Sequence, residues 1–531
     1  MRITELINSG LAGAITVFAP IAAYIFAAWF NMRYFIHMFQ LNSYKPKVQR
    51  KWLADNSLKF FTAHFAVIAA VFALIAFKAD TWLISAFVTI ALIASGLAKL
   101  PKKHYKTPIK YTKRLVRMII TTSVLDLLAA ALGIIVRFDS GMIVMSFMIF
   151  MTPFVILLAN LINRPLEKAI NRHYINDAER ILRECPDLTV IGITGSFGKT
   201  SVKYFLDTLL SEKFSVLKTP GNFNTPLGVV KTIRGSLRAT HEVFLCEMGA
   251  KNVGDIKEIC DIVKPKHGII TSVGPMHLES FKTIENVKKT KFELADAVAE
   301  NGMLFLNTDD KNVLSKADSY SYISYGTENH GGYYATDLRI SEKGSEFTVH
   351  SPDGKKCDYK TSLIGRHNII NIVGAISVSN KLGISLEELR PAVRRLESVP
   401  HRLELINKGT YSVIDDAYNS NPNGARAALE ALSMTDGMKI LVTPGMIELG
   451  EKQNDLNFEF GEEAAKVCDY CALVGEKQTE YILKGLVKSG FPKEKIYVAD
   501  SLNDAMQKVY SLTSDGKRKI ILLENDLPDN Y

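Results

Sequence analysis

A chain of 531 residues is long enough for several domains, and its hydrophobic fraction of 47% is ordinary for folded protein. Its formal charge of +9 is uneven, because the first 163 residues hold 17 Lys and Arg against 5 Asp and Glu. These charges lie between long apolar runs, which argues against nucleic acid as a partner. Six cysteines do not make a disulfide framework at this length. Cys468 and Cys471 have no second pair or nearby histidine, so core packing is expected rather than zinc or redox chemistry.

Five apolar segments predict a membrane domain over residues 1–163 with five transmembrane helices. The first segment carries no charge and is long enough to span a bilayer as a helix. It is longer than the apolar core of a signal peptide and further apolar runs follow it, so we expect it to be retained. The segments lie at 11–30, 60–77, 82–97, 118–135 and 142–162.

The loops between these segments predict the orientation of the chain. The loops at 31–59 and 99–117 are rich in Lys and Arg, so the positive-inside rule places them in the cytoplasm. The loops around Asp80 and Asp139 are short and nearly neutral, which places them outside. The N-terminus would then lie outside the plasma membrane, and everything after Arg164 in the cytoplasm. Binding of anionic or phosphorylated lipid by the basic loops is an open alternative to a role in topology alone.

Asp126 is the one acidic residue within the five expected spans. Carboxylates inside membranes are costly and often functional. A position near the cytoplasmic end would also allow solvation, or pairing with Arg117. Both interpretations stay open at this point.

From residue 164 the pattern becomes an alternation of short apolar and amphipathic stretches, typical of a parallel sheet covered by helices. A helix is expected at 172–185. Expected strands lie at 189–193, 243–246, 268–271 and 303–306. A second set begins near Arg402, with expected strands at 412–414, 439–443, 470–474 and 519–523. The predicted fold is an α-helical membrane domain followed by two α/β domains, at 164–399 and 400–531.

The stretch Val190–Ser201 has the order strand, glycine turn and helix start that suits a nucleotide's phosphates. Backbone N–H groups at the helix start would face the phosphates, and Lys199 would add a charge. Thr200 or Ser201 could ligate Mg²⁺. The spacing departs from the standard phosphate loop, which has a glycine where Ile193 stands. An ordinary tight turn with an exposed lysine is the alternative.

Three polar positions follow the next expected strands. Glu247 ends an apolar strand, His277 lies in a loop after the following strand, and Lys289–Leu294 opens a helix. The carboxyl ends of neighbouring parallel strands meet at the crevice where open α/β sheets bind ligands. A single Glu or His there is usually a cap or a satisfied polar group. Both together beside the phosphate loop indicate a ligand site.

Seven stretches of this sequence resemble the motifs of the Mur ligase family, the ATP-dependent ligases that build the peptide of peptidoglycan. The resemblance covers residues 190–449, and the last two stretches are most similar to the family branch that adds D-alanyl-D-alanine. It implies a central ATP-binding domain with a phosphate loop and a Rossmann-like C-terminal domain on the amine side. The stretches are Thr194–Ser201, Pro220–Gly228, Asn307–Asp310, Gly365–Asn371, His401–Glu404, Asp415–Pro422 and Met446–Gly450.

The resemblance implies an ATP site with assigned roles. Lys199 would stabilise the transferring γ-phosphoryl group, and Asn307 would face adenine. Arg402 and Asp415 would contact the γ-phosphate and the ribose. The implied ATP-binding residues are Gly195, Ser196, Phe197, Gly198, Lys199, Thr200, Ser201, Asn307, Arg402 and Asp415.

It also implies two Mg²⁺ ions, with Lys199, Glu247, His277 and Lys291 as catalytic residues. Thr200 and Glu247 would hold one ion. His277 would serve the second, bridged by a carbamylated Lys291, because a lysine ligates a cation only after its charge is replaced. Lys289 is the rival position. Lys291 has the family's Lys-x-Glu spacing to Glu293.

The resemblance implies substrate-binding residues on both domains. His367, with Asn368 and Asn371, would alternatively only pack the domain junction. The implied substrate-binding residues are Asn222, Asn224, His367, Asn419 and Asn421.

The sequence departs from the family in two places. Only about thirty residues separate the last expected span from the phosphate loop, too few for a domain that holds a UDP-sugar. The segment Leu522–Tyr531 is acidic where the D-alanyl-D-alanine branch carries Lys-Gly-Ser, which puts that dipeptide in doubt.

The leading hypothesis is a membrane-embedded ligase. It would activate a carboxylate as an acyl phosphate on a cell-envelope precursor, with a lipid-linked precursor among the options, and join it to a peptide or amino-acid amine. A poly-γ-glutamate-type ligase and a non-catalytic nucleotide sensor of a membrane protein are the alternatives. Four intact positions argue against a sensor, because a sensor needs no second metal site. They are Lys199, Glu247, His277 and Lys291.

Overall fold

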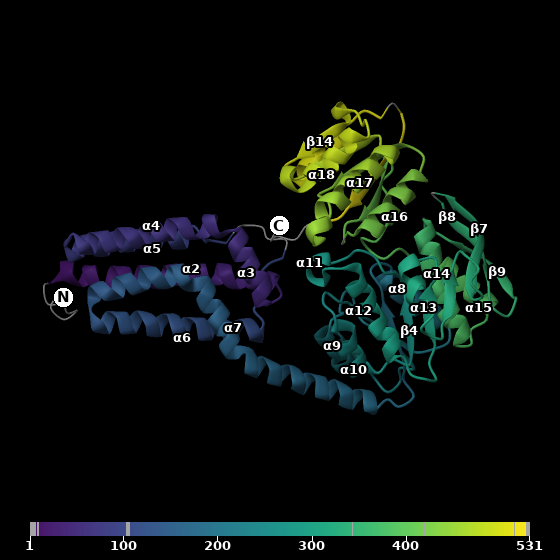
Figure 1. The fold of residues 1–531 in the computed structure, drawn as a ribbon, viewed down its shortest axis with the longest axis horizontal. Coiled ribbons are helices and arrows are strands. Elements are labelled where there is room, and N and C mark those ends of the chain that lie inside the picture. Colours follow the sequence, from purple (N-terminus) through teal and green to yellow (C-terminus); the bar gives the residue numbers. More distant parts are fainter. Residues whose placement is uncertain are drawn as a thin grey trace. The chain divides into compact units, whose positions relative to one another are not determined.

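The computed structural model describes residues 7, 10–101, 107–341, 343–418, 420–514 and 516–526. These residues form two compact units that meet in the sequence at Arg172 and His173 (Figure 1). Each unit is described separately below.

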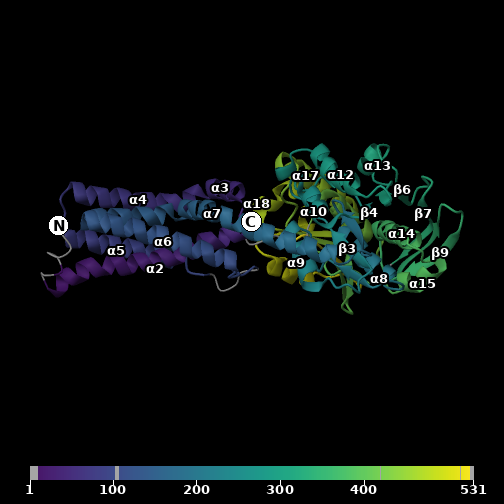
Figure 2. The ribbon, with the colours of Figure 1, turned by 90° about the horizontal axis from the view of Figure 1, so that it is seen from below.

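The N-terminal unit is a bundle of helices that lie alongside one another (Figures 1 and 2). Each apolar segment expected from the sequence is part of a helix. Many large apolar side chains point outward, for example Phe65 and Ile90, as they do in helices that contact lipid. The helices are α2 (Leu11–Leu41), α3 (Pro46–Asp55), α4 (Ser57–Ala76), α5 (Thr81–Leu97), α6 (Lys113–Val136) and the first part of α7 (Phe138–Arg183).

Three of these helices are long and apolar enough to cross a membrane, within the part of the chain that the structure describes. They are Leu11–Leu41, Lys113–Ile135 and Ser140–Arg183. A fourth span results if Pro46–Asp55 and Phe60–Ala76, bent by 74° to each other, count as one. Thr81–Leu97 is apolar but shorter. Three or four candidate spans are therefore established by length and composition.

Helix α7 differs from the sequence prediction. We expected a span at 142–162 and a separate helix at 172–185, but one helix of 46 residues runs through both, with Pro153 and Pro165 inside it. A proline removes one helix hydrogen bond without forcing the chain to stop. In the last turns Arg180 pairs with Asp177 and Glu184, at spacings that stabilise a helix.

The second unit begins with a sheet of nine strands in the order β2-β3-β1-β4-β5-β6-β7-β8-β9. Pairs from β2 to β7 are parallel, and β7, β8 and β9 pair antiparallel. The strands are β1 (Thr189–Thr194), β2 (Val216–Lys218), β3 (Val243–Glu247), β4 (His267–Ile270), β5 (Leu304–Asn307), β6 (Ile323–Gly326), β7 (Tyr333–Ser341), β8 (Gly344–His350) and β9 (Lys356–Thr361).

Helices cover both faces of this sheet, because successive strand residues alternate between two apolar cores. Leu245 and Phe305 pack with α8, α14 and α15, whereas Phe244 and Leu306 pack with helices α9 to α13. The helices are α8 (Lys199–Leu210), α9 (Pro226–Ser236), α10 (Asp255–Val263), α11 (Leu278–Phe281), α12 (Ile284–Ala297), α13 (Lys311–Ala317), α14 (Arg366–Lys381) and α15 (Leu386–Arg394).

A second sheet has the order β10-β11-β15-β12-β13-β14 and is parallel except for the pair of β10 with β11. Helices α16, α17 and α18 pack on one face and α19 on the other. The elements are β10 (Glu404–Asn407), β11 (Tyr411–Asp416), α16 (Pro422–Ser433), β12 (Met438–Thr443), η1 (Gly450–Lys452), α17 (Gln453–Val467), β13 (Tyr470–Val474), α18 (Glu476–Lys488), η2 (Lys493–Lys495), β14 (Ile496–Ala499), α19 (Leu502–Ser511) and β15 (Lys519–Glu524). The predicted fold class, apolar helices followed by two parallel α/β sheets, is confirmed.

Candidate active site

The phosphate loop lies between β1 and α8, as the sequence predicted. Gly198 precedes the helix with φ of 82°, a left-handed conformation that favours glycine. A Cβ atom at Gly198 would also lie 2.7 Å from Oδ1 of Asn371 on α14. Both observations require glycine at this turn, whose backbone opens the N-terminus of α8 toward a ligand.

Hydrogen bonds tie the loop to the segment after β4. The backbone N–H of Phe197 donates to Ser272 Oγ at 2.8 Å, and that of Ser196 to the Ser272 carbonyl at 2.9 Å. Ser196 Oγ accepts from the Gly274 N–H at 2.9 Å. The loop is therefore held in shape by the neighbouring strand.

Lys199 reaches back over this loop. Its Nζ donates to the carbonyls of Gly195 at 2.7 Å and Ser196 at 3.3 Å. Burial lowers the pKa of Lys199 to about 8; Glu247 opposes that shift, and Arg402 adds to it.

Glu247, at the end of β3, joins three segments of the site. Its carboxylate accepts from Thr200 Oγ1 at 3.2 Å, Asn224 Nδ2 at 3.0 Å and Lys203 Nζ at 2.8 Å. Burial would raise the pKa of Glu247, but Lys203 and then Lys199 outweigh burial and lower it. Glu247 is 1% exposed and ionised, which suits a metal-binding carboxylate.

Lys203 is a residue that the sequence prediction missed. It is fully buried and pairs with Glu247 and with the Gly221 carbonyl at 2.8 Å. The sequence contains one indication that Lys203 belongs to the site. It lies four residues after Lys199 and so on the same face of α8.

Lys291 is 2% exposed, whereas Lys289 is exposed. Burial lowers the pKa of Lys291 well below its usual value, and Lys199 adds to that shift. Its helix, α12, begins at Ile284, five residues before the expected start, because Thr283 caps it. Glu293 accepts hydrogen bonds from two backbone N–H groups at the start of α10, those of residues 254 and 257, at 2.7 and 2.9 Å.

His277 precedes α11 with φ of 51°, and its Nδ1 bonds Glu448 of the C-terminal domain. Lys251 Nζ lies 2.8 Å from the same carboxylate. Burial would raise the pKa of Glu448, but His277 and Lys251 lower it to about 2. Burial lowers the pKa of His277, and Glu448 opposes that shift. Glu448, which had no predicted role, connects the two domains at the site.

Asparagines expected at the site have structural partners. Asn307 Nδ2 donates to the Thr271 carbonyl at 2.8 Å, and Asn421 accepts from the Gly424 N–H at 3.1 Å as the cap of α16. Asn222 is exposed. Asn419 lies outside the described residues.

His367 follows Gly365, where a Cβ atom would lie 2.6 Å from the imidazole. Its Nδ1 has no hydrogen-bond partner among the described residues. Burial lowers the pKa of His367 to about 4, so the ring is neutral. Its neighbour Asn368 donates to the Ile364 carbonyl at 2.8 Å.

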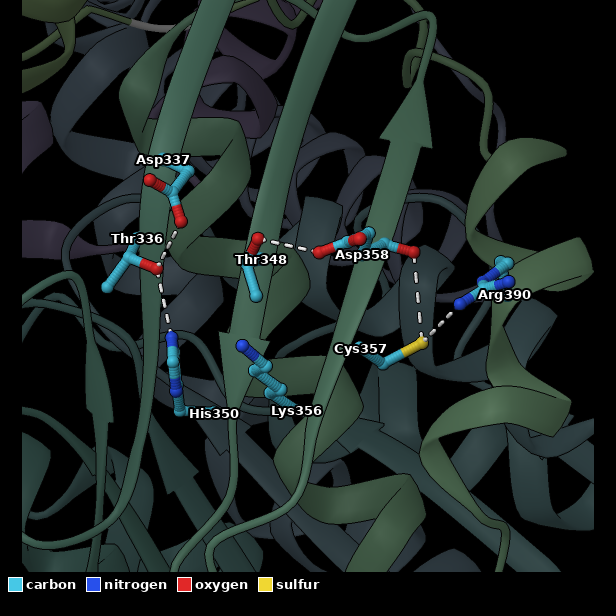
Figure 3. A pocket seen from close by; sticks show the side chains of 8 residues that line it. All are labelled: Thr336, Asp337, Thr348, His350, Lys356, Cys357, Asp358 and Arg390. Carbon is cyan, nitrogen blue, oxygen red and sulfur yellow. Dashed lines mark hydrogen bonds between the residues drawn. The ribbon is translucent and has the colours of Figure 1, made fainter.

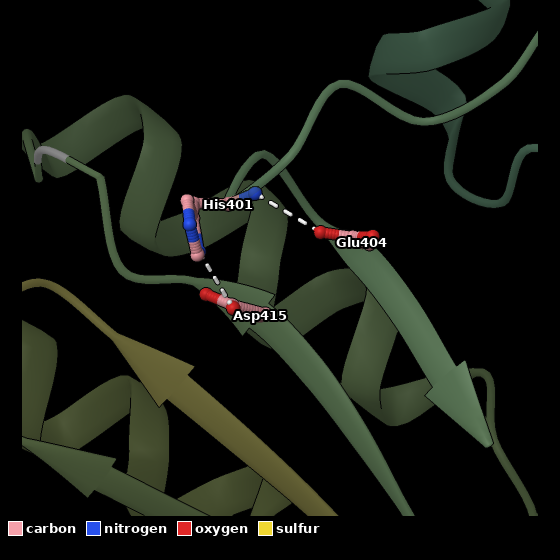
Figure 4. Close-up of side chains that lie close together, drawn as sticks. All are labelled: His401, Glu404 and Asp415. Carbon is pink, nitrogen blue, oxygen red and sulfur yellow. Dashed lines mark hydrogen bonds and ion pairs between the residues drawn. The ribbon is translucent and has the colours of Figure 1, made fainter.

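His401, Glu404 and Asp415 gather at the start of the C-terminal domain (Figure 4). His401 Nδ1 lies 2.8 Å from Asp415 Oδ2, and the His401 N–H donates to Glu404 at 3.2 Å. The guanidinium of Arg402, the residue after His401, lies 4.3 Å from the ring centre of Tyr418. His401 is exposed and Asp415 is buried, and we assign no metal to this group.

The end of β15 carries a buried carboxylate. Glu524 is opposite Asp416 of β11, accepts from Ser420, and accepts from Thr443 Oγ1 at 3.0 Å. Burial raises its pKa to about 7, with both hydroxyls opposing. Burial also raises the pKa of Asp416, and Glu524 adds to that shift. Of this pair, Glu524 lies in the acidic segment Leu522–Tyr531, where the D-alanyl-D-alanine branch carries Lys-Gly-Ser.

A separate pocket of about 530 Å³ lies on β7, β8, β9 and α15 (Figure 3). It is away from the phosphate loop, and none of its lining residues was predicted to have a role. Basic and acidic groups are mixed there, so it favours neither sign of charge. The lining residues are Thr336, Asp337, Thr348, His350, Lys356, Cys357, Asp358 and Arg390.

Comparison with known proteins identifies the family of this chain. Residues 193–379 match the Mur ligase middle domain, and residues 401–523 match the domain described as "Mur ligase, glutamate ligase domain". The UDP-N-acetylmuramoyl-tripeptide–D-alanyl-D-alanine ligase of Bacillus subtilis is 30% identical over 335 residues, 62% of this chain and 71% of that protein. Its Escherichia coli counterpart is 29% identical over 385 residues, which cover 69% of this chain and 84% of that protein.

Solved structures of MurF proteins are also similar to this chain. MurF from Thermotoga maritima in complex with ADP is 28% identical with a TM-score of 0.61, covering 67% of this chain and 80% of that one. MurF from Acinetobacter baumannii is 26% identical with a TM-score of 0.62, and the match covers 68% of this chain and 78% of that one.

The fold, the phosphate loop and these matches define an ATP-dependent, ADP-forming ligase that makes amide bonds. The chain belongs to the Mur ligase family and is similar to its MurF members, which act on peptidoglycan precursors. ATP and Mg²⁺ are the cofactors of this family.

We expect Lys203→Met to lower the free energy of unfolding by about 3–5 kcal/mol and to abolish ATP turnover, because it leaves Glu247 as an uncompensated buried charge. Chemical denaturation and phosphate release measure the two effects. Lys484→Met is the matched control, since its pair with Glu480 is exposed and contributes little to stability. Equal effects of the two variants would contradict the assigned role of Lys203.

We expect Glu524→Gln to remove a pH dependence of stability. The folded pKa of about 7 lies above the ordinary glutamate value, so the stabilisation is complete below about pH 4.5 and is lost as pH rises toward 7, by up to about 1.4 kcal/mol per pH unit. Thermal midpoints of both proteins between pH 5 and 8 measure the difference. The control is Glu480→Gln, on the surface. Parallel wild-type and Glu524→Gln curves would refute the prediction.

Proposed function

We propose that this chain is a membrane-embedded ligase that joins an amine to a carboxylate of a cell-envelope precursor through an acyl phosphate. The observation that carries the proposal is the convergence on Glu247 of the phosphate loop, the Asn224 loop and Lys203. The relatives in Bacillus subtilis and Escherichia coli, named for a peptidoglycan tripeptide precursor, support the substrate class.

In the first step a carboxylate oxygen of the substrate attacks the γ-phosphorus of ATP, and the bond to ADP breaks. We propose that Lys199, at the phosphate loop, neutralises charge on the transferring group and that Arg402 adds a second cation there. In the second step the amine nitrogen attacks the acyl carbon, phosphate leaves, and the nitrogen loses a proton. Holding both substrates in line is the main contribution of the protein.

The donor set of Thr200 and Glu247 fits Mg²⁺, which prefers hydroxyl and carboxylate oxygens. Bound there, Mg²⁺ would offset phosphate charge. We further propose that Lys291 is carbamylated: its lowered pKa leaves a neutral amine, whose nitrogen bonds the carbon of CO₂ and releases a proton. The carbamate and His277 would hold a second Mg²⁺.

On the nucleotide we propose contacts from Gly195–Ser201 and Asn307, with Arg402 and Asp415 at the γ-phosphate and ribose. Asn307 is held by the Thr271 carbonyl, which would orient it toward adenine. On the substrates we propose contacts from five residues. They are Asn222, Asn224, His367, Asn419 and Asn421.

We propose five spans with the N-terminus outside, a membrane domain at 1–163, and catalytic domains at 164–399 and 400–531 in the cytoplasm. The apolar helices and the basic loops support this orientation. A ligase attached to the bilayer would meet a lipid-linked precursor there, in place of a UDP-linked one.

The amine substrate is tested by phosphate release from the full chain in detergent. The assay contains ATP, Mg²⁺, a UDP-linked or lipid-linked tripeptide, and one amine at a time. We expect turnover only when both an amine and a carboxylate substrate are present. D-alanyl-D-alanine is the reference amine, and other amines are included because Leu522–Tyr531 is acidic where that branch carries Lys-Gly-Ser. Glutamate-dependent polymer would favour the poly-γ-glutamate alternative, and amine-independent turnover would refute the ligase proposal.

We expect Lys291→Ala to lose at least about 100-fold in amine-dependent turnover, and short-chain carboxylates such as acetate or propionate to restore part of it. The reason is that a free carboxylate can replace the carbamate oxygens. Lys289→Ala is the matched control, exposed on the same helix, and should keep wild-type turnover. Loss without rescue, or unchanged activity, would remove the carbamate assignment.

A further inference from the structure

Three polar side chains inside the N-terminal unit each carry an oxygen without a hydrogen-bond partner among the described residues. They are Asn31 Oδ1 on α2, and Thr122 Oγ1 and Asp126 Oδ1 on α6. The residues are 0%, 0% and 5% exposed. An unpaired buried polar atom destabilises the fold, and a bilayer offers no water to replace the partner. Three such atoms in one bundle therefore point to a ligand.

Two contacts place these atoms at the same depth in the bundle. The Tyr24 hydroxyl donates to the main-chain carbonyl of Asp126 at 3.4 Å. Ser123 Oγ lies 3.7 Å from the sulfur of Met32. Asn31 lies between Tyr24 and Met32 on α2, so its side chain is at the level of these α6 residues.

All three residues are buried inside the bundle. Thr122 and Asp126 are four residues apart, so they share one face of α6. On α2, Asn31 follows Tyr24 by seven residues, about two turns, so it lies on the face of α2 from which Tyr24 contacts the main chain of Asp126. The expected alternative partner of Asp126 is engaged elsewhere, since Arg117 pairs with Glu167 at 2.7 Å.

The hydrogen bonds of Asn31 fix which of its atoms is free. Its Nδ2 donates to the Ala27 carbonyl at 2.9 Å and to Ser95 Oγ at 3.1 Å, and a carbonyl can only accept. His64 Nδ1 must likewise donate to the Phe60 carbonyl at 2.8 Å, so the Ser95 hydroxyl donates to Nε2 of a neutral His64 at 3.0 Å. The unpaired Oδ1 of Asn31 is thus an acceptor, and neither Ser95 nor His64 has a hydrogen left to donate to it.

The donor atoms select the ligand. An amide oxygen, a hydroxyl and a carboxylate all bind a hard cation, and the carboxylate repels phosphate and other anionic headgroups. One carboxylate balances a single positive charge, whereas Ca²⁺ sites take six to eight oxygens and usually several carboxylates. Lys99, the nearby basic residue, places its ammonium 4.5 Å and 4.3 Å from the ring centres of Tyr34 and Phe60.

We propose that Asn31, Thr122 and Asp126 form a binding site for a monovalent metal cation in the membrane unit, with Na⁺ as the probe ion. The site is independent of the nucleotide site, because all three residues belong to α2 and α6. It gives Asp126 a function that the ligase chemistry does not require.

The test is binding of ²²Na⁺ to the full chain in detergent without ATP, at constant ionic strength set with choline chloride. We expect saturable binding of one ion per chain, competed by unlabelled Na⁺ and Li⁺. Asp126→Asn should weaken binding at least tenfold, and Thr122→Val should weaken it less. The control is Ser146→Ala, because Ser146 is buried in α7 but donates to the Met142 carbonyl at 3.0 Å. It should bind like the wild type.

Circular dichroism checks that each variant is folded. If Asp126→Asn does not fold, Thr122→Val and Asn31→Leu decide the question. Absence of saturable ²²Na⁺ binding in the wild type would overturn the proposal, as would equal binding by all variants. If the three oxygens bind only protons or water, the wild type shows no saturable ²²Na⁺ binding. The outcome does not depend on the ligase assay, so either proposal can fail alone.

Discussion

The buried ion pair of Lys203 with Glu247 is the interaction on which the nucleotide site depends. A carboxylate at the end of a central strand would normally take up a proton when buried, because desolvation disfavours its charge. Lys203 prevents that, and so keeps an anion where a cation-binding oxygen is needed. Thr200 and Asn224 then converge on the same carboxylate. The pair thus connects α8, the phosphate loop and the loop that holds Asn224 through the side chain of Glu247.

Much of this arrangement follows from local sequence. The glycine turn, the apolar strands and Glu247 at a strand end were predicted because each depends on a few neighbouring residues. Lys203 was missed because its burial depends on β3, which is more than forty residues away in the sequence. Glu448 was missed for the same reason, since its partner His277 lies in another domain.

The differences from the prediction have physical causes as well. A span at 142–162 and a separate helix at 172–185 were expected, but α7 runs through both and includes Pro165, because one lost hydrogen bond is outweighed by the turns on either side. The adenine contact expected of Asn307 stays a prediction; the structure adds that its Nδ2 donates to the Thr271 carbonyl. Sequence patterns identify a polar residue at a strand end without showing which of its atoms is already engaged.

The contact of His277 with Glu448 decides which tautomer the imidazole adopts. Nδ1 faces the carboxylate and carries the hydrogen, so the lone pair that remains is on Nε2. A carboxylate behind an imidazole also makes the ring a more basic ligand. The C-terminal domain therefore prepares a donor atom of the central domain, and separating the two domains would leave the ring free to rotate and to change its tautomer.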